Sequence, residues 1–351
     1  MRYKLLGHSG LRVSEACLGT MTFGQASAWG ASREDSQAVF DAFVEAGGNF
    51  IDTAPIYQGG ASETMLGEFV APDRDRFVIG TKYSLGSIHG DPNASGNGRK
   101  SMMRAVEASL RRMKTDYIDL FWMHAWDGVT PEEEVLRGLD DLVRAGKVLH
   151  IGLSDTPAWV VARSHAIAEL RGWTSLAAIQ IKYSLVERSP DRDLLPMAAA
   201  LGLSVLVWGG LGGGMLSGKY AASGGLLDGK GRLTQVGPAA RALSEHDRAV
   251  IETVVDVARA RGADPAAVAL AWIRSRSPML IPLLGARVVE QLSSNLAALT
   301  LDLTETEILR LNTPSAVAGG FPADFIGGPM ITAGLFGDMR DRLDARSRLT
   351  L

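Results

Sequence analysis

Residues 117–154 read YIDLFWMHAWDGVTPEEEVLRGLDDLVRAGKVLHIGLS, and this stretch decides the fold class. It begins and ends with apolar runs of strand length, 117–123 and 150–154. Between them, Thr130 and Pro131 followed by acidic residues are typical of the first turn of a helix. Gly146 marks the end of that helix. A strand, a helix and a second strand in this order predict a parallel β–α–β unit.

The same alternation continues along the chain. Apolar runs of strand length occur at 15–19, 49–53, 77–82, 117–123, 150–154, 177–181, 204–208 and 279–282. Helical patterns lie at 32–46, 101–113, 130–146, 190–202, 244–262 and 288–299, with another beginning at Asp155. Most strand runs are apolar on both sides of the pleat, which suits a parallel sheet covered on both faces. Strand–helix units that close on themselves predict an α/β fold, a (β/α)8 TIM barrel.

The length of 351 residues permits one large barrel. We expect a single domain over 1–351, with the barrel at about 12–300 and a C-terminal extension over 313–351. An open, doubly wound sheet is the alternative, but its fingerprint G-x-G-x-x-G does not occur in the sequence. Long segments at 84–100 and 211–243 follow strands three and seven, so we expect them to cover the catalytic face. We expect the tail to pack near the same mouth.

The composition argues against several classes of function. The net charge is −3, which gives no strongly basic face for nucleic acid. The one cysteine, Cys17, cannot form an intrachain disulfide or a CxxC pair, and the histidines lack metal-ligand spacing, so no metal is predicted. No apolar run is long enough to span a bilayer, and no signal peptide is recognisable. We expect a cytoplasmic protein with no nucleic-acid or membrane partner.

Chemically capable side chains gather at the ends of the predicted strands. Asp52 ends the second strand, and Tyr57 follows five residues later. Lys82 ends the third strand, and His124 follows the fourth. A lysine after an apolar strand requires an anion, because burying an unpaired ammonium is costly. Asp52 on the adjacent strand is the nearest candidate.

These four side chains suggest acid–base chemistry for hydride transfer. A lysine ammonium favours phenolate and so lowers the pKa of a neighbouring tyrosine. Tyr57 could then give a proton to a carbonyl oxygen and recover it from an alcohol. His124 can hydrogen-bond the same oxygen, and Asp52 can hold Lys82 in place. The hydride would come from a cofactor.

The chain resembles the aldo-keto reductases over residues 1 to about 312. The motifs that carry the resemblance are GNFIDTAPIY at 48–57, SETMLG at 62–67, TK at 81–82, DYIDL at 116–120 with MH at 123–124, GKV at 146–148 with IGLS at 151–154, QIKYSL at 180–185, GMLSGKY at 214–220, and IP, GAR and QLSSNL between 281 and 296. Their number and order make the resemblance specific for the superfamily. It implies that Asp52, Tyr57, Lys82 and His124 are the catalytic tetrad, with Tyr57 as the general acid.

The resemblance also implies NADPH (NADP⁺) bound without a Rossmann domain. Ser154, Asp155 and Gln180 match the positions that hold the nicotinamide carboxamide, and Trp208 matches the aromatic side chain that stacks on its ring. Arg287 suits the adenosine 2′-phosphate, where a guanidinium fork is favoured. The other positions matched to the cofactor are Gly209, Leu211, Gly213, Lys219, Gly285, Gln291 and Asn295.

Two departures from the family pattern concern the cofactor. The usual Trp-Ser-Pro-Leu is here Trp208-Gly209-Gly210-Leu211, which removes a hydroxyl and a proline where the pyrophosphate passes. Glycine backbone amides could replace the lost contact, or cofactor affinity could be lower. Asp155 stands where asparagine is common, and an ionised carboxylate accepts hydrogen bonds but cannot donate them.

For the substrate, the implied partner is a small molecule with an aldehyde or ketone carbonyl. We expect Phe23, Tyr83 and Trp126 to line its pocket together with Tyr57, and Trp29 is a further candidate, although packing roles are alternatives for the tryptophans. Two other functions remain open. One is reduction of a bulky secondary-metabolite or sugar-nucleotide ketone, and the other is a non-catalytic NADPH-sensing subunit of a channel. The intact tetrad favours catalysis, since fold alone does not decide among them.

Overall fold

The computed structural model describes residues 1–86, 90–219 and 243–343. Eight parallel strands form a closed barrel in the order β10-β3-β4-β5-β6-β7-β8-β9. Their bounds are β3 Cys17–Gly19, β4 Phe50–Asp52, β5 Val78–Tyr83, β6 Ile118–Met123, β7 Val148–Ser154, β8 Leu176–Lys182, β9 Ser204–Trp208 and β10 Leu280–Gly285. Each strand overlaps a predicted apolar run. The TIM barrel expected from the sequence is therefore confirmed.

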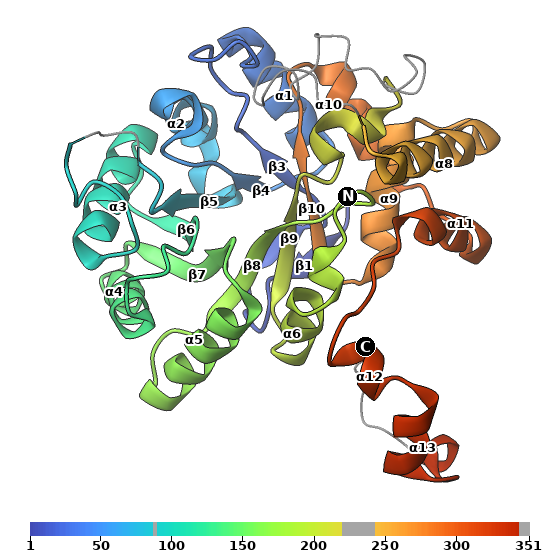
Figure 1. Cartoon of the computed structure of the whole chain (residues 1–351). Helices are drawn as coiled ribbons and strands as arrows, with labels where there is room; N and C mark the ends of the chain where they lie inside the picture. The colour runs from blue at the N-terminus through green and yellow to red at the C-terminus, as the bar shows by residue number, and fades with distance from the viewer. Residues whose placement is uncertain (87–89, 220–242, 344–351) are drawn as a thin grey trace.

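Helices surround the barrel (Figure 1). Their bounds are α1 Arg33–Glu45, α2 Ala61–Val70, α3 Arg99–Met113, α4 Glu132–Arg144, α5 Ala158–Arg171, α6 Leu194–Ala200, α8 Glu245–Arg261, α9 Pro265–Arg276, α10 Val289–Leu296 and α11 Glu305–Ser315. Local signals fix several of their starts. The Ser32 side chain accepts a hydrogen bond from the Asp35 backbone at α1, and Ser244 forms a reciprocal capping box with Asp247 at α8.

Several elements were not expected from the sequence. An N-terminal hairpin pairs β1 Tyr3–Leu5 with β2 Arg12–Ser14, and Leu6 and Val13 beside it join the buried cluster of the barrel interior. Helix α2 has no side-chain cap, because the residue before its first turn is Gly60, which is in the left-handed region. The usual signal for a helix start is therefore missing. Helix α9 lies between α8 and β10, so the described residues between β9 and β10 contain two α-helices where one was predicted.

The barrel interior is tightly filled. Trp122 is fully buried there together with Cys17, Phe50 and Leu206. Gly152 lies against the Trp122 ring, where a β-carbon would come 2.3 Å from the indole. Because the interior is a packed core and contains no pore, polar groups at the carboxyl ends of the strands are confined to the mouth above it.

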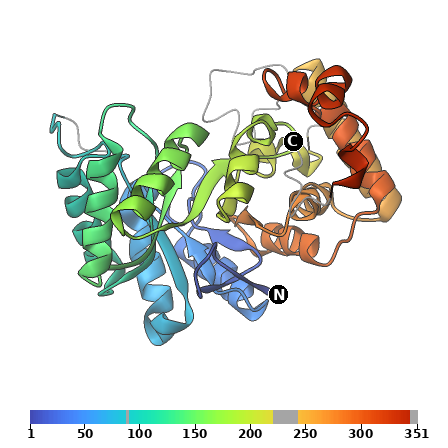
Figure 2. The same ribbon diagram turned by 90° about the horizontal axis from the view of Figure 1, so that it is seen from below.

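The C-terminal tail does not pack at the mouth. Its helices, α12 Ala323–Ile326 and α13 Pro329–Phe336, contain no buried residue and stand outside the ring of helices (Figure 1, Figure 2). The expectation for the tail is therefore wrong for α12 and α13. Before them, the Ala318 carbonyl oxygen accepts a hydrogen bond from Arg192 in the segment after β8. Much of the expected covering segment 211–243 falls on 220–242, which lie outside the described residues. No helix among the described residues is both long and apolar enough to cross a membrane.

Candidate active site

A buried ion pair forms the centre of the site. Asp52 ends β4 and Lys82 lies near the end of β5, two residues beyond Gly80, which is paired with Asp52. Both side chains are essentially inaccessible to solvent, and the Lys82 ammonium contacts the Asp52 carboxylate directly. The ammonium also donates to the Thr53 carbonyl oxygen at 2.8 Å. Burial opposes the charge of Lys82, but Asp52 and Tyr57 outweigh it and raise the lysine pKa. Lys82 is therefore held as a cation.

Tyr57 lies next to this cation. It follows β4 at the start of a short 3-10 segment, Tyr57–Gly60, and its hydroxyl is 3.4 Å from Lys82 Nζ. His124 follows β6, and its ring meets the Tyr57 ring edge-on with centroids 6.2 Å apart. Burial and the positive charge of Lys82 lower the pKa of His124 to about 3. The structure therefore brings the four predicted tetrad residues together, with the imidazole neutral at physiological pH.

One cavity of about 1030 Å³ opens above this group. The tetrad members that line it are Asp52, Tyr57 and His124, whereas Lys82 lies buried behind them. The predicted cofactor residues also line it, namely Ser154, Asp155, Gln180, Trp208, Gly209, Leu211, Gly213, Lys219, Gly285, Arg287, Gln291 and Asn295. Residues that are far apart in the sequence thus share one continuous space, because they lie near the carboxyl ends of parallel strands or in the segments that follow them.

Hydrogen bonds fix the side chains at the end of this cavity that lies next to the Asp52–Lys82 ion pair, here called the closed end. The Trp208 indole N–H donates to Asp155 Oδ1 at 3.0 Å. Gln180 Nε2 donates to Asp52 Oδ1 at 3.0 Å, which links the end of β8 to the ion pair. The Ser154 hydroxyl is buried and has no hydrogen-bond partner among the described residues. A buried hydroxyl without a partner is uncommon and marks a place where a ligand group would be accommodated.

A glycine-rich turn forms the next part of the wall. Gly209 and the segment Gly212–Ser217 follow β9, and Gly212, Gly213 and Gly214 have φ values of 57°, 70° and 98°. These are left-handed conformations that favour glycine. A β-carbon on Gly212 would also come 2.7 Å from the Val186 side chain. The departure from the family pattern therefore produces a turn whose backbone lies directly against the cavity.

The open end of the cavity lies at β10 and α10. The Arg287 backbone N–H donates to Gln291 Oε1 at 2.9 Å, and the Arg287 side chain is exposed. Asn295 is buried and donates from Nδ2 to the Gly285 carbonyl oxygen at 3.2 Å. The two amide side chains thus fix the turn between strand and helix and leave the guanidinium accessible from solvent.

The predicted substrate-pocket residues are not part of this lining. Phe23 and Tyr83 are 0% and 1% exposed, and they pack in the hydrophobic core around the barrel. The Tyr83 ring stacks on Phe121, and Trp126 packs edge-on against Trp159. Phe23 and Tyr83 are therefore enclosed in the core, whereas Trp126 is partly buried against Trp159, which is exposed. The residues that line the catalytic end in their place are Met21, Trp29 and Ile56. Of these, only Trp29 carried a usable signal in the sequence, as a large aromatic residue in a loop.

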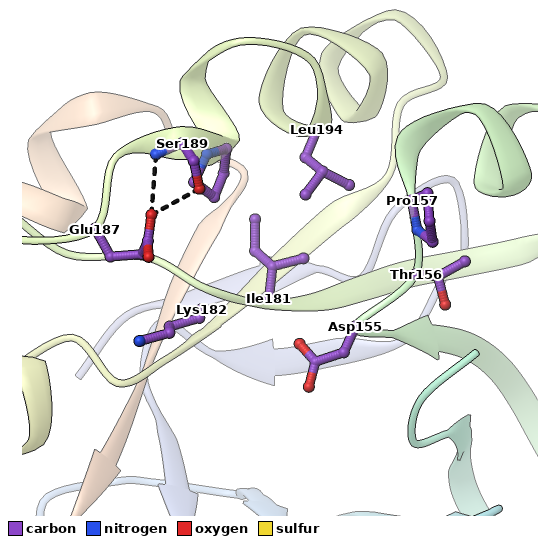
Figure 3. A pocket seen from close by; sticks show the side chains of 9 residues that line it. Asp155, Thr156, Pro157, Ile181, Lys182, Glu187, Ser189 and Leu194 are labelled. Carbon is purple, nitrogen blue, oxygen red and sulfur yellow. Dashed lines mark hydrogen bonds between the residues drawn. The ribbon is translucent and has the colours of Figure 1, made fainter. Parts of the chain in front are cut away.

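A second, smaller cavity of about 320 Å³ adjoins the first (Figure 3). The two share Asp155, Lys182 and Glu187. Glu187 accepts hydrogen bonds from the backbone and the hydroxyl of Ser189, as the dashed lines in Figure 3 show. Leu194 provides an apolar wall. Asp155 therefore lies where the two spaces meet.

Comparison with known proteins agrees with this geometry. Residues 15–313 match the model of the aldo/keto reductase family. A norsolorinic acid reductase of Emericella nidulans is 40% identical over 328 residues, which cover 91% of this chain and 82% of that protein. An aldo-keto reductase of Aspergillus calidoustus is 34% identical over 342 residues, 93% of this chain and 85% of that protein. An aryl-alcohol dehydrogenase of Pestalotiopsis microspora is 34% identical over 336 residues, again 93% and 85%. The chain belongs to the aldo/keto reductase family and is an oxidoreductase.

Proposed function

We propose that this protein reduces the carbonyl group of an aldehyde or ketone with NADPH, and that Tyr57 is the general acid. The observation that carries the proposal is the position of the Tyr57 hydroxyl. It is 3.4 Å from a buried, positively charged lysine and lies at the wall of the large cavity. A cation beside a phenol stabilises the phenolate that remains after proton donation.

Each of the other three residues has a distinct role in this proposal. Asp52 holds Lys82 in place through the buried ion pair, and the Thr53 carbonyl oxygen fixes the ammonium further. Lys82 stabilises the negative charge that develops on Tyr57. His124 is neutral, so it can donate one hydrogen bond to the substrate oxygen and orient it without competing for the proton.

The residues present fit a nicotinamide cofactor at the closed end of the cavity. The buried Ser154 hydroxyl lacks a partner, which a carboxamide group would supply. Asp155 and Gln180 lie on either side of it at the ends of β7 and β8, and Trp208 offers an aromatic surface. NADPH, when bound, supplies the hydride. These residues would hold the nicotinamide in the part of the cavity that Tyr57 and His124 also line.

The opposite end suits the rest of the dinucleotide. Backbone amides of the turn at 209–214 and the Lys219 side chain would bind the pyrophosphate, and the exposed Arg287 guanidinium would bind the 2′-phosphate. Gln291 and Asn295, together with the nearby Gly285, would border the adenosine. This assignment supports NADPH over NADH, because only the former carries the 2′-phosphate.

The test is a turnover assay. Purified protein is mixed with NADPH and a panel of aldehydes and ketones, and the absorbance of the reduced nicotinamide is followed. We expect loss of that absorbance with at least one carbonyl compound. Tight NADPH binding without turnover of any carbonyl would instead favour the non-catalytic sensor.

A second candidate concerns the size of the substrate. A bulky secondary-metabolite ketone is favoured by the relatives that are named norsolorinic acid reductases, including the one from Emericella nidulans. The apolar surface formed by Met21, Trp29 and Ile56 beside Tyr57 would suit a large aromatic substrate. The same panel separates the two cases when it contains both small and polycyclic ketones. A higher kcat/KM for the polycyclic compounds is the expected result for the bulky-substrate candidate.

A further inference from the structure

Asp155 is the one acidic side chain among the residues proposed to hold the carboxamide. It follows β7, and its backbone N–H donates to the Gln180 carbonyl oxygen at 3.1 Å. Its Oδ1 accepts the Trp208 indole N–H at 3.0 Å. The backbone and side-chain bonds together fix the carboxylate beside the aromatic surface and at the border of the two cavities.

The Asp155 carboxylate accepts the Trp208 N–H, and it forms no ion pair within the part of the chain that the structure describes. Lys182 lines the same cavity, and its ammonium lies over the Trp208 ring, 5.9 Å from the centroid. Partial burial raises the pKa of Asp155, whereas the Trp208 hydrogen bond and the charges of Lys82 and Lys182 oppose that shift.

The rest of the catalytic end is electrically balanced. Asp52 and Lys82 compensate each other, and His124 is neutral. Lys182 and Glu187, which line both cavities, carry opposite charges. The Asp155 carboxylate therefore gives the site proposed for the nicotinamide ring a negative electrostatic potential. The two redox forms of a nicotinamide differ in charge, because the oxidised ring is a cation and the reduced ring is neutral. A fixed negative charge nearby stabilises the cation selectively.

Resting on the proposed function, we propose that Asp155 makes the site bind NADP⁺ more tightly relative to NADPH. During reduction a hydride passes to the carbonyl carbon and the Tyr57 proton passes to the carbonyl oxygen, so the carbonyl is reduced and the nicotinamide is oxidised. Asp155 therefore favours hydride transfer on the enzyme, and it slows release of the oxidised cofactor. Asparagine at this position would hold the carboxamide without that electrostatic preference.

The test compares the dissociation constants of NADP⁺ and NADPH, measured by quenching of tryptophan fluorescence, in the wild type and in Asp155→Asn. The substitution preserves shape and an acceptor for the Trp208 N–H. It also suits the backbone, because Asp155 has a φ of 42° and asparagine tolerates that region as well as aspartate does. We expect the ratio of the NADP⁺ constant to the NADPH constant to rise about tenfold.

Glu290→Gln is the matched control, because Glu290 lines the same cavity on α10, at the end assigned to the adenosine. It should leave the ratio unchanged. An unchanged ratio in Asp155→Asn, or an equal change in Glu290→Gln, would overturn the inference while leaving the proposed function intact. A wild type that binds neither nucleotide overturns both.

If Asp155→Asn folds poorly, a measurement on the wild type alone still tests the inference. Salt screens charges at the accessible rim of a site. NADP⁺ and NADPH carry the same phosphates. The effect of salt on phosphate binding is therefore the same for both and cancels in the ratio of their dissociation constants. We expect the ratio to rise between 0.05 and 1 M salt, by about threefold. A ratio independent of salt would contradict a charge-based preference.

Discussion

The ammonium of Lys82 lies 3.4 Å from the hydroxyl of Tyr57, and the same ammonium contacts both the Asp52 carboxylate and the Thr53 carbonyl oxygen. The Asp52 carboxylate and the Thr53 carbonyl oxygen therefore fix the position of the ammonium. The phenol meets a charge that is already placed, which reduces the reorganisation needed when the proton leaves. The Asp52–Lys82 ion pair is thus part of both the buried structure of the barrel and the proposed acid–base site.

Lys82→Met tests this connection by leaving Asp52 buried without a cation. Breaking a buried pair from one side costs about 3–5 kcal/mol, so the free energy of unfolding in urea should fall by that amount. Carbonyl reduction should fall by at least about a hundredfold. Lys147→Met is the matched control, since Lys147 pairs with Glu107 on the surface and such pairs contribute about 1 kcal/mol or less. Equal losses of stability in the two variants would refute the structural role.

His124 should make the protein sensitive to acid. Burial and Lys82 lower its pKa to about 3, whereas the unfolded chain has the ordinary value of 6.5. Below pH 6.5 the unfolded state binds more protons than the folded state, so stability is present above that pH and is lost as pH falls toward 3. In His124→Gln, the free energy of unfolding should decline less steeply between pH 6.5 and 4. Identical slopes in the two proteins would show that His124 does not contribute.

Arg287→Ala should separate the two nicotinamide nucleotides. We expect the dissociation constant of NADPH to rise by about tenfold or more, because a charge-assisted contact to phosphate is lost. The constant for NADH should change by less than about twofold. Arg287→Lys is the control, since it keeps the charge and loses the planar fork, and it should give an intermediate value. Equal weakening of both nucleotides would exclude a 2′-phosphate role.

Gly152→Ala should destabilise the barrel without touching the cavity. The new β-carbon would lie 2.3 Å from the Trp122 ring and 2.8 Å from the Ala178 carbonyl oxygen. Overpacking of this kind costs about 1–3 kcal/mol, measurable as a lower midpoint of urea unfolding. Gly334→Ala in α13, where a β-carbon meets nothing within 4 Å, should not lower stability, because alanine favours a helix over glycine by about 0.5–1 kcal/mol. A neutral Gly152→Ala would contradict the tight packing around Trp122.

The barrel was predictable because its strands are buried on both faces. Runs such as 118–123 are apolar apart from Asp119, so they stand out from amphipathic helices. The tetrad was predictable because ionisable residues directly after such runs must meet at one end of the barrel. Helix α2 was missed because the residue before its first turn is a glycine, which has no capping side chain. Helix α9 has eight consecutive buried residues, Ala266–Ile273, so it lacks the polar face that signals an amphipathic helix.

The substrate pocket was the weakest part of the prediction. Phe23 follows β3, and Tyr83 is the last residue of β5. Side chains at such positions can point either to the mouth or to the surrounding helices, and sequence alone does not distinguish the two. Both point into the core. The tail could not be placed either, because α12 and α13 carry apolar residues such as Phe325 and Met330 that remain exposed. Apolar character alone would have predicted their burial.

Tyr57→Phe examines the central claim most directly, because it removes one oxygen atom and keeps the ring. The measurement is the rate of NADPH oxidation with the best carbonyl substrate, together with the NADPH dissociation constant of the same variant. We predict that turnover falls by at least about a hundredfold while the dissociation constant stays within about twofold of the wild type. Turnover within a few-fold of the wild type would contradict the assignment of Tyr57 as the general acid.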